Sequence, residues 1–193
     1  AQTFLMENHR PLWLLKVLET EHREGVQHLP WQANRNVYGH VLQCGETVAE
    51  LGIGMHSYSR VTFELPSEAT RFTSQVGLDR RAGAGGCVHC VVYGDDPNKP
   101  LWQKRFLRGS DGLQEVGPLD VAGQSQLTLE VDFADEDRPD GADPLDIRDW
   151  VNWLNPAVQI TPNPSKNRSE VEQLIPEITG WSLKENLYSK LKL

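Results

Sequence analysis

The chain has 193 residues, 38% of them hydrophobic and 24% charged, with a formal net charge of −8 at pH 7. This length and apolar content predict one sizeable globular domain with extensions, or at most two small domains. The acidic balance and the absence of lysine or arginine runs argue against nucleic acid and anionic lipid as main partners, and no apolar stretch is long enough to span a membrane.

The first part of the chain predicts short strands joined by turns. The apolar run Leu12–Leu18 is predicted as a first strand, and the segment 34–46, NRNVYGHVLQCGE, as a further strand and turn. In the segment 51–65, LGIGMHSYSRVTFEL, we expect a turn at Gly52 and Gly54, followed by a strand. Apolar and polar residues alternate along that strand, as they do when one face is buried. Its inward side chains are Val61, Phe63 and Leu65.

Similar alternation is present downstream at 71–79, 101–107 and 126–133. Further strands are predicted at 71–79, 87–93, 101–107 and 126–133, with a glycine-rich loop, RRAGAGG, at 80–86. In the last of these strands the predicted core side chains are Leu127, Leu129, Val131 and Phe133. Short strands at near-regular spacing, with turn signals between them and no long helical period, predict an all-β sandwich or barrel of antiparallel strands.

The three cysteines are too few to staple the fold. Cys87 and Cys90 form a CxxC, but residues three apart on a strand point to opposite faces and cannot readily share a metal ion or a disulfide. We therefore expect buried free thiols. A bridge from Cys44 to one of this pair is the alternative.

The alternation stops beyond Pro156. Residues 1–158 are expected to form the sandwich, and residues 159–193 a short C-terminal extension. The extension contains a proline-punctuated linker and a short predicted helix, Ser169–Ile175. Its apolar side chains offer enough surface to pack on the sandwich, so we expect no separate domain there. These side chains are Trp181, Leu183, Leu187, Tyr188 and Leu191.

Three segments together resemble the NPCBM family of galactose-binding-like carbohydrate-binding modules. They are LGIGMHS at 51–57, RFTSQVGLD at 71–79 and LDIRDW at 145–150. The corresponding family patterns are Gly-Leu-Gly-x-His-Ser/Ala, Arg-Phe…Val-Gly-x-Asp and Asp-His-x-Asp-Trp. The resemblance covers residues 13–156 and implies a jelly-roll β-sandwich. It also implies a non-catalytic, extracellular or periplasmic domain that binds a neutral sugar or glycan.

Sugar recognition needs a flat aromatic side chain against the apolar side of the pyranose, and polar groups that hydrogen-bond its hydroxyls. The resemblance implies that the turn carrying His56 lies close to the Asp146–Trp150 segment, in which Ile147 replaces the usual histidine. His56 is expected either to donate to a sugar hydroxyl or to hold the turn as a structural histidine. The predicted sugar-binding residues are His56, Arg80, Asp146, Asp149, Trp150 and Trp153. Trp150 or Trp153 is expected to be the exposed aromatic face, and a structural role is the alternative for Trp150.

Acidic residues are concentrated between Asp132 and Asp149. Such oxygen-rich loops suit calcium, which takes about six to eight oxygen ligands, although a solvated charge run accounts for the same residues. A structural calcium is the one cofactor predicted. Its candidate ligands are Asp79, Asp135 and Asp137.

No specific set of catalytic groups is present, because the sequence has no nucleophile elbow, no HExxH and no phosphate loop. A glycosidase needs only two carboxylates, and nothing in the sequence selects a pair. The alternative to sugar binding is a protein-interaction or cell-surface scaffold on the same sandwich, because fold does not fix function. A concave polar pocket with aromatic surface would favour sugar, and a flat apolar patch would favour a protein partner.

Overall fold

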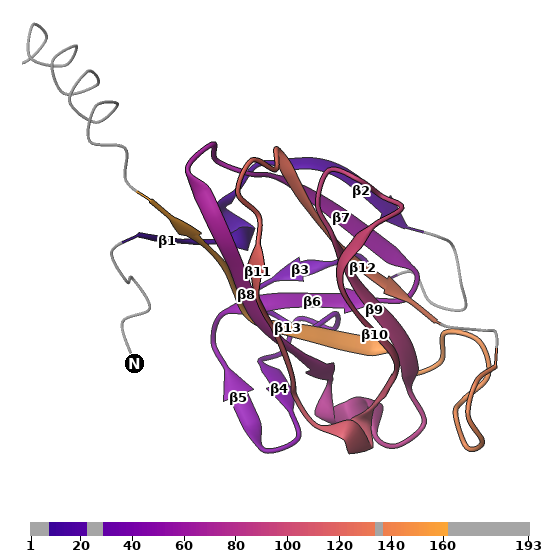
Figure 1. Cartoon of the computed structure of the whole chain (residues 1–193). Coiled ribbons are helices and arrows are strands. Elements are labelled where there is room, and N and C mark those ends of the chain that lie inside the picture. Colours follow the sequence, from indigo (N-terminus) through magenta and orange to yellow (C-terminus); the bar gives the residue numbers. More distant parts are fainter. Residues whose placement is uncertain (1–7, 23–28, 134–136, 162–193) are drawn as a thin grey trace, which may run out of the picture. The chain divides into compact units, whose positions relative to one another are not determined.

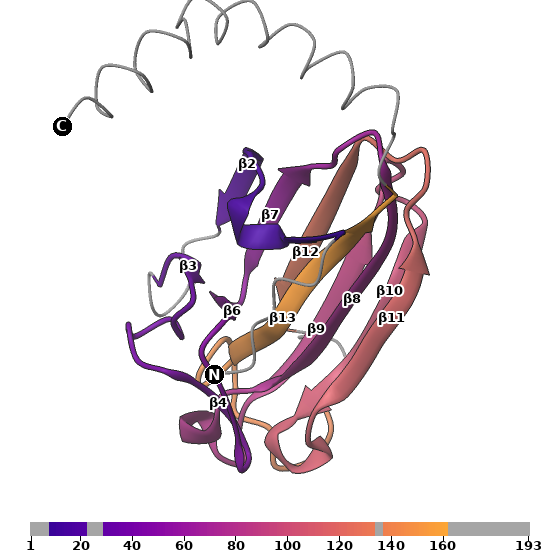
Figure 2. The same ribbon diagram turned by 90° about the vertical axis from the view of Figure 1, so that its left-hand side faces the viewer.

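The structure is a computed structural model, and it describes residues 8–22, 29–133 and 137–161. Two antiparallel sheets pack face to face as a sandwich (Figures 1 and 2). The strand order is β11–β8–β13–β6–β3 in one sheet, where β1 also pairs with β13, and β10–β9–β12–β7–β2 in the other. The predicted all-β fold, a jelly-roll sandwich of antiparallel strands, is confirmed.

The first sheet comprises β1 (His9–Pro11), β3 (Gln32–Ala33), β6 (Gly52–His56), β8 (Ala69–Leu78), β11 (Gln114–Asp120) and β13 (Trp150–Ile160). The second comprises β2 (Val17–His22), β7 (Ser59–Glu64), β9 (Cys87–Tyr93), β10 (Pro100–Arg108) and β12 (Gln126–Asp132). A separate hairpin is formed by β4 (Leu42–Cys44) and β5 (Thr47–Ala49), and three single-turn 3-10 helices are η1 (Leu12–Leu14), η2 (Arg80–Ala82) and η3 (Gly109–Asp111).

The core lies between the sheets and is built from the alternating strands that the sequence predicts. Strands β7 and β12 pair along their length, with Phe63 opposite Leu127 and Val61 opposite Leu129. All predicted core residues are buried except Phe133, which follows the end of β12 and is only half-buried. On the other face of this strand pair, Thr62 and Thr128 are also buried, and their hydroxyls lie 2.9 Å apart in a hydrogen bond.

The predicted strand at Leu12–Leu18 is wrong. Leu12–Leu14 forms η1, and β2 begins only at Val17. Leu12 is fully buried whereas Leu14 is largely exposed. An unbroken apolar run carries no period, so it cannot distinguish a strand from a helical turn followed by a strand.

The glycine pair lies in a strand, not in the predicted turn. Strand β6 is entirely buried, between its neighbours β13 and β3 in the sheet. A Cβ at Gly52 would lie 2.7 Å from the Leu42 side chain, and a Cβ at Gly54 would lie 2.6 Å from the Asn36 Cα. The glycines therefore let the 36–42 segment lie directly on this strand.

All three cysteines are free and buried, as predicted. Burial raises the pKa of the Cys44 thiol to about 12 and also raises the pKa of Cys90, so these thiols stay protonated and inert.

Strand β13 ends at Ile160, beyond the predicted sandwich boundary at residue 158. The predicted packing of the C-terminal extension concerns residues 162–193, which lie outside the described residues. No helix in the described part of the chain is long and apolar enough to cross a membrane.

Candidate functional site at the loop end of the sandwich

The antiparallel order gathers several loops at one end of the sandwich. Strands β6, β8, β10 and β12 end there, and β7, β9, β11 and β13 begin there, because each pairs with neighbours of opposite direction. The loops 79–86 and 109–113 and the segment 137–149 consequently lie close together (Figure 1). In such folds loops carry the binding groups while the sheets hold them in place.

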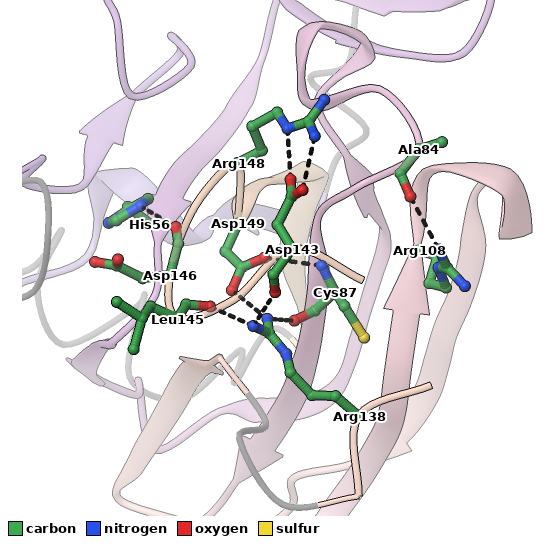
Figure 3. Close-up of polar contacts among 10 residues, drawn as sticks. All are labelled: His56, Ala84, Cys87, Arg108, Arg138, Asp143, Leu145, Asp146, Arg148 and Asp149. Atoms are coloured by element: carbon green, nitrogen blue, oxygen red, sulfur yellow. Dashed lines mark hydrogen bonds and ion pairs between the residues drawn. The ribbon is translucent and has the colours of Figure 1, made fainter. Parts of the chain in front are cut away.

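A buried polar network fastens the segment 137–149 to both sheets (Figure 3). The Asp149 carboxylate is fully buried and accepts hydrogen bonds from the Cys87 backbone N–H at 2.8 Å, the Ser57 hydroxyl at 3.2 Å and Arg138 Nη2 at 2.9 Å. Burial raises the pKa of Asp149 to about 7, against the opposite effect of these donors. One carboxylate thus joins β9, the turn after β6 and the segment itself.

His56 makes a second attachment. Its imidazole is fully buried, and Nε2 lies 3.0 Å from the Asp146 carbonyl oxygen, so Nε2–H donates. Burial lowers the pKa of His56, which keeps the ring neutral with an unprotonated Nδ1. Of the two roles predicted for His56, this geometry corresponds to the structural one. The ring holds the segment 137–149, which we call the closing segment, and has no exposed edge.

Arginines give the segment its internal shape (Figure 3). Arg138 donates to the carbonyl oxygens of Asp143 and Leu145 in the segment, and across to the Cys87 carbonyl oxygen at 2.6 Å. Arg148 pairs with Asp143 through two hydrogen bonds, at 2.5 and 2.8 Å. Sequence reasoning treated these residues as part of a solvated charge run and missed both pairings. The interleaving of arginine with aspartate in the stretch was the available signal.

Asp79 anchors the neighbouring loop. It is buried, and its Oδ2 accepts hydrogen bonds from Asn36 Nδ2 at 3.0 Å and Asn152 Nδ2 at 2.9 Å, while Oδ1 accepts from the Arg81 backbone N–H at 3.0 Å. The Asn36 orientation is fixed, because its Oδ1 accepts two backbone N–H groups. Its amino group must therefore face Asp79, where a calcium ion would need an oxygen.

Protein donors therefore already engage both oxygens of Asp79, and calcium binding by this residue stays a prediction. Of the other two candidates, Asp137 is exposed and Asp135 lies outside the described residues. Within the described ranges no three histidine, cysteine, aspartate or glutamate side chains are grouped so as to share a metal ion. Calcium binding by the acidic stretch stays a prediction.

A pocket of about 320 Å³ opens beside Asp79 at this end of the sandwich. Its lining includes the side chains of Leu78, Arg80 and Ser110 and the glycine-rich backbone around Gly83. The Arg80 side chain is 55% exposed, and its Nη1 lies 3.6 Å from Oε1 of Glu46, whose side chain is 91% exposed. Arg80 is the predicted sugar-binding residue that lines this pocket. Its guanidinium and the Glu46 carboxylate place donors and an acceptor side by side.

Exposed aromatic surface lies on the adjacent loop. Tyr38, which is 40% exposed, meets Trp150 edge to face with 4.7 Å between ring centroids. Trp150 is half-buried and lies opposite His56 in the register of β13 and β6. Trp153 is fully buried and packs on Trp102 with 6.2 Å between centroids, so the expectation that Trp153 is exposed is wrong. It lies within β13, on the face that packs against the other sheet.

The structure therefore brings the predicted residues of the two motifs together, but mostly below the surface. His56, Asp146 and Asp149 are buried and hold the closing segment, so their side chains do not line a surface that a sugar could reach. Arg80 and Trp150 lie nearer solvent. Sequence reasoning missed Tyr38, whose position in the 34–46 segment carried no motif.

The chain belongs to the NPCBM/NEW2 domain family, whose sequence profile matches residues 12–159. This match confirms the resemblance seen in the three motifs. No curated protein matches the chain.

Solved structures with the same fold are CBM51 modules. The CBM51 of Clostridium perfringens GH95 in complex with methyl-galactose has a TM-score of 0.63 at 20% identity, over 78% of this chain and 99% of that chain. The structure of CBM51-2 in complex with GlcNAc and INT domains from Clostridium perfringens ZmpB has a TM-score of 0.64 at 22% identity, over 91% of this chain and 36% of that one. The tandem CBM51 modules of the family 98 glycoside hydrolase from Streptococcus pneumoniae SP3-BS71 have a TM-score of 0.62 at 13% identity, over 80% of this chain and 48% of that one. At these identities the similarity shows the shared β-sandwich fold.

Proposed function

We propose that this chain is a non-catalytic carbohydrate-binding module that recognises a neutral sugar or glycan in the pocket beside Arg80. Membership of the NPCBM/NEW2 family supports carbohydrate binding. Two structures of the same fold are complexes with methyl-galactose and with GlcNAc, both neutral sugars. The observation that carries the proposal is the pocket at the loop end, with its charged lining and the exposed Tyr38 ring on the next loop.

The chemistry of this end of the sandwich suits a pyranose. A sugar hydroxyl both donates and accepts hydrogen bonds. The Arg80–Glu46 pair offers a donor and an acceptor beside the pocket, and Ser110 is a further polar residue in the lining. The Tyr38 ring offers a flat apolar face for the C–H side of a sugar. Because the site is open and a sugar would bury little surface there, we expect micromolar to millimolar affinity.

The pocket lining favours binding without catalysis. A glycosidase needs two carboxyl groups that flank the scissile bond. Of the two carboxylates that the structure describes at this site, Glu46 pairs with Arg80, and protein donors already engage both oxygens of Asp79. A concave pocket with an arginine in its lining also favours sugar over the protein-interaction scaffold, for which a flat apolar patch is expected. An extracellular or periplasmic location is part of the proposal, because glycan-binding domains meet their ligands there.

The test is a glycan-array screen of the chain, with and without calcium, followed by chemical-shift titration with the sugars that bind. Arg80→Ala should abolish the sugar-induced shifts while the domain stays folded. Arg71→Ala is the matched control, because Arg71 is also exposed but lies near the opposite end of β8. No binding to any glycan would contradict the proposed function, and wild-type affinity in Arg80→Ala would contradict the site.

A further inference from the structure

Asn36 organises the loop that presents Tyr38. Its backbone N–H donates to the His40 carbonyl oxygen at 2.8 Å, and its own carbonyl oxygen accepts from the Gly39 N–H at 2.9 Å. Its side-chain Oδ1 accepts from the N–H groups of Tyr38 at 3.0 Å and His40 at 2.9 Å. Asn36 itself is 2% exposed. One buried residue thus fixes the backbone on both sides of the exposed tyrosine.

Asp79 organises the turn that presents Arg80. Its carboxylate accepts from the Arg81 N–H at the start of η2, its carbonyl oxygen accepts from the Ala82 N–H at 2.9 Å, and its N–H donates to the Trp150 carbonyl oxygen at 2.8 Å. Like Asn36, Asp79 is 2% exposed. The direction in which Arg80 leaves the sheet therefore depends on the Asp79 carboxylate.

The two organising residues are bonded to each other. The hydrogen bond from Asn36 Nδ2 to Asp79 Oδ2 is 3.0 Å long, buried, and joins positions 43 residues apart in the chain. Because the acceptor is a carboxylate, this bond is stronger than one between neutral groups. It ties the Tyr38 loop to the Arg80 turn through a single contact.

We infer that Asn36 and Asp79 form a positioning pair, which sets the aromatic Tyr38 side of the sugar site at a fixed place relative to its polar Arg80 side. The inference rests on the proposed function, because it assigns these two sides to one site. A weak ligand that contacts both sides gains most when they are already held in place, since no binding free energy goes into ordering them. Both side chains are buried, so their role is to hold the two loops.

The experiment exchanges the two side-chain groups. Asn36→Asp places a second carboxylate against Asp79, and two carboxylates this close cannot both ionise. Asp79→Asn replaces a carboxylate that accepts three hydrogen bonds by an amide. The amide NH2 group then faces at least one of the three donors and cannot accept its hydrogen bond. The double variant N36D/D79N restores one carboxylate facing one amide. Asn152 can follow by turning its amide, because its buried Oδ1 has no hydrogen-bond partner among the described residues, and the turn gives up only the long 3.4 Å bond from its Nδ2 to the Gln43 carbonyl oxygen.

Two readouts are measured, the hydrogen exchange of the Tyr38 and His40 backbone amides and the affinity for methyl-galactose and GlcNAc by chemical-shift titration. Each single variant should speed the exchange of these amides and weaken sugar binding about tenfold, the effect of losing about one buried hydrogen bond. The double variant should recover both properties to within about threefold of the wild type. Single variants that exchange and bind like the wild type, or a double variant that combines both defects, would overturn the inference.

Thr128→Val is the control for general destabilisation. The substitution removes the hydrogen-bond partner of the buried Thr62 hydroxyl. Both threonines lie within β7 and β12, away from the loop end of the sandwich. The substitution should lower the melting temperature as the single variants do while leaving sugar affinity and the Tyr38 amide unchanged. An equal loss of sugar affinity in this control would mean that stability alone governs binding. A wild-type chain that binds neither sugar contradicts the proposed function for these two sugars, while the exchange measurement still tests the pair.

Discussion

The attachment of the closing segment by Asp149 gives a sharp stability prediction. Asp149→Ala removes the acceptor of three buried donors, namely the Cys87 N–H, the Ser57 hydroxyl and the Arg138 guanidinium. An unsatisfied buried neutral donor costs about 1–3 kcal/mol, and breaking a buried ion pair from one side costs about 3–5 kcal/mol. The Arg138 side chain is 13% exposed, so water can solvate it only in part. At pH 8, where Asp149 is ionised, we expect a loss of about 3–5 kcal/mol in the free energy of unfolding.

The same substitution predicts a pH dependence. Burial raises the pKa of Asp149 from 3.8 to about 7 in the folded state, so between these values the folded chain binds a proton that the unfolded chain does not. Stability from this group therefore rises as pH falls from about 7 towards 4, with a slope of at most about 1.4 kcal/mol per pH unit. The difference between wild type and Asp149→Ala should grow over this range. Titrations common to both proteins, such as that of His56, cancel in the comparison.

Urea denaturation of both proteins at several pH values between 4 and 8, followed by tryptophan fluorescence, measures this difference. Asp143→Ala is the matched control, because it breaks the Arg148 pair in the same segment, where the Arg148 side chain is 44% exposed. Exposed pairs are worth at most about 1 kcal/mol, so this control should be nearly silent. A cost for Asp149→Ala below about 1 kcal/mol, or a difference that shrinks as the pH falls, would refute the reasoning.

Three further predictions follow from the core, His56 and the acidic stretch. Leu129→Ala truncates a fully buried leucine on β12 and should cost about 2–5 kcal/mol in urea denaturation; a largely helical circular-dichroism spectrum of the wild type would contradict the sandwich itself. Burial lowers the pKa of His56 below the 6.5 of the unfolded chain, so the stability contributed by this ring falls as the pH drops below 6.5. A folded-state pKa at or above 6.5, measured by NMR titration of the imidazole, would contradict this. If the stretch with Asp135 and Asp137 binds calcium, a chelator should lower the melting temperature and added calcium should restore it, whereas an unchanged melting curve would leave the stretch as solvated surface.

The sequence determined the strands whose side chains alternate. A strand with one buried face places apolar and polar residues in turn along the chain, and this pattern is visible without knowledge of the fold. This is why the inward residues Phe63 and Leu129 agree with the structure. The strand Cys87–Tyr93 does not alternate, and its bounds followed from the turn signals on either side. The motifs around His56, Asp79 and Asp149 also indicated the family correctly, since each combines residue types at a fixed spacing. The apolar run from Leu12 has no period, and there the prediction failed.

Only the tertiary structure decided the role of each motif residue. Whether His56 and Asp149 meet a sugar or the protein depends on contacts with distant parts of the chain. His56 meets the Asp146 carbonyl oxygen, 90 residues away, and Asp149 meets Ser57 and Cys87, 92 and 62 residues away. The same applies to Gly54, which reads as a turn residue locally but lies in a buried strand because the Asn36 loop packs directly on it. Tyr38 and Glu46 join Arg80 at the loop end through contacts between distant segments, which no local pattern encodes. Burial and proximity are properties of the packed chain, so the candidate site could be named from the sequence only in part.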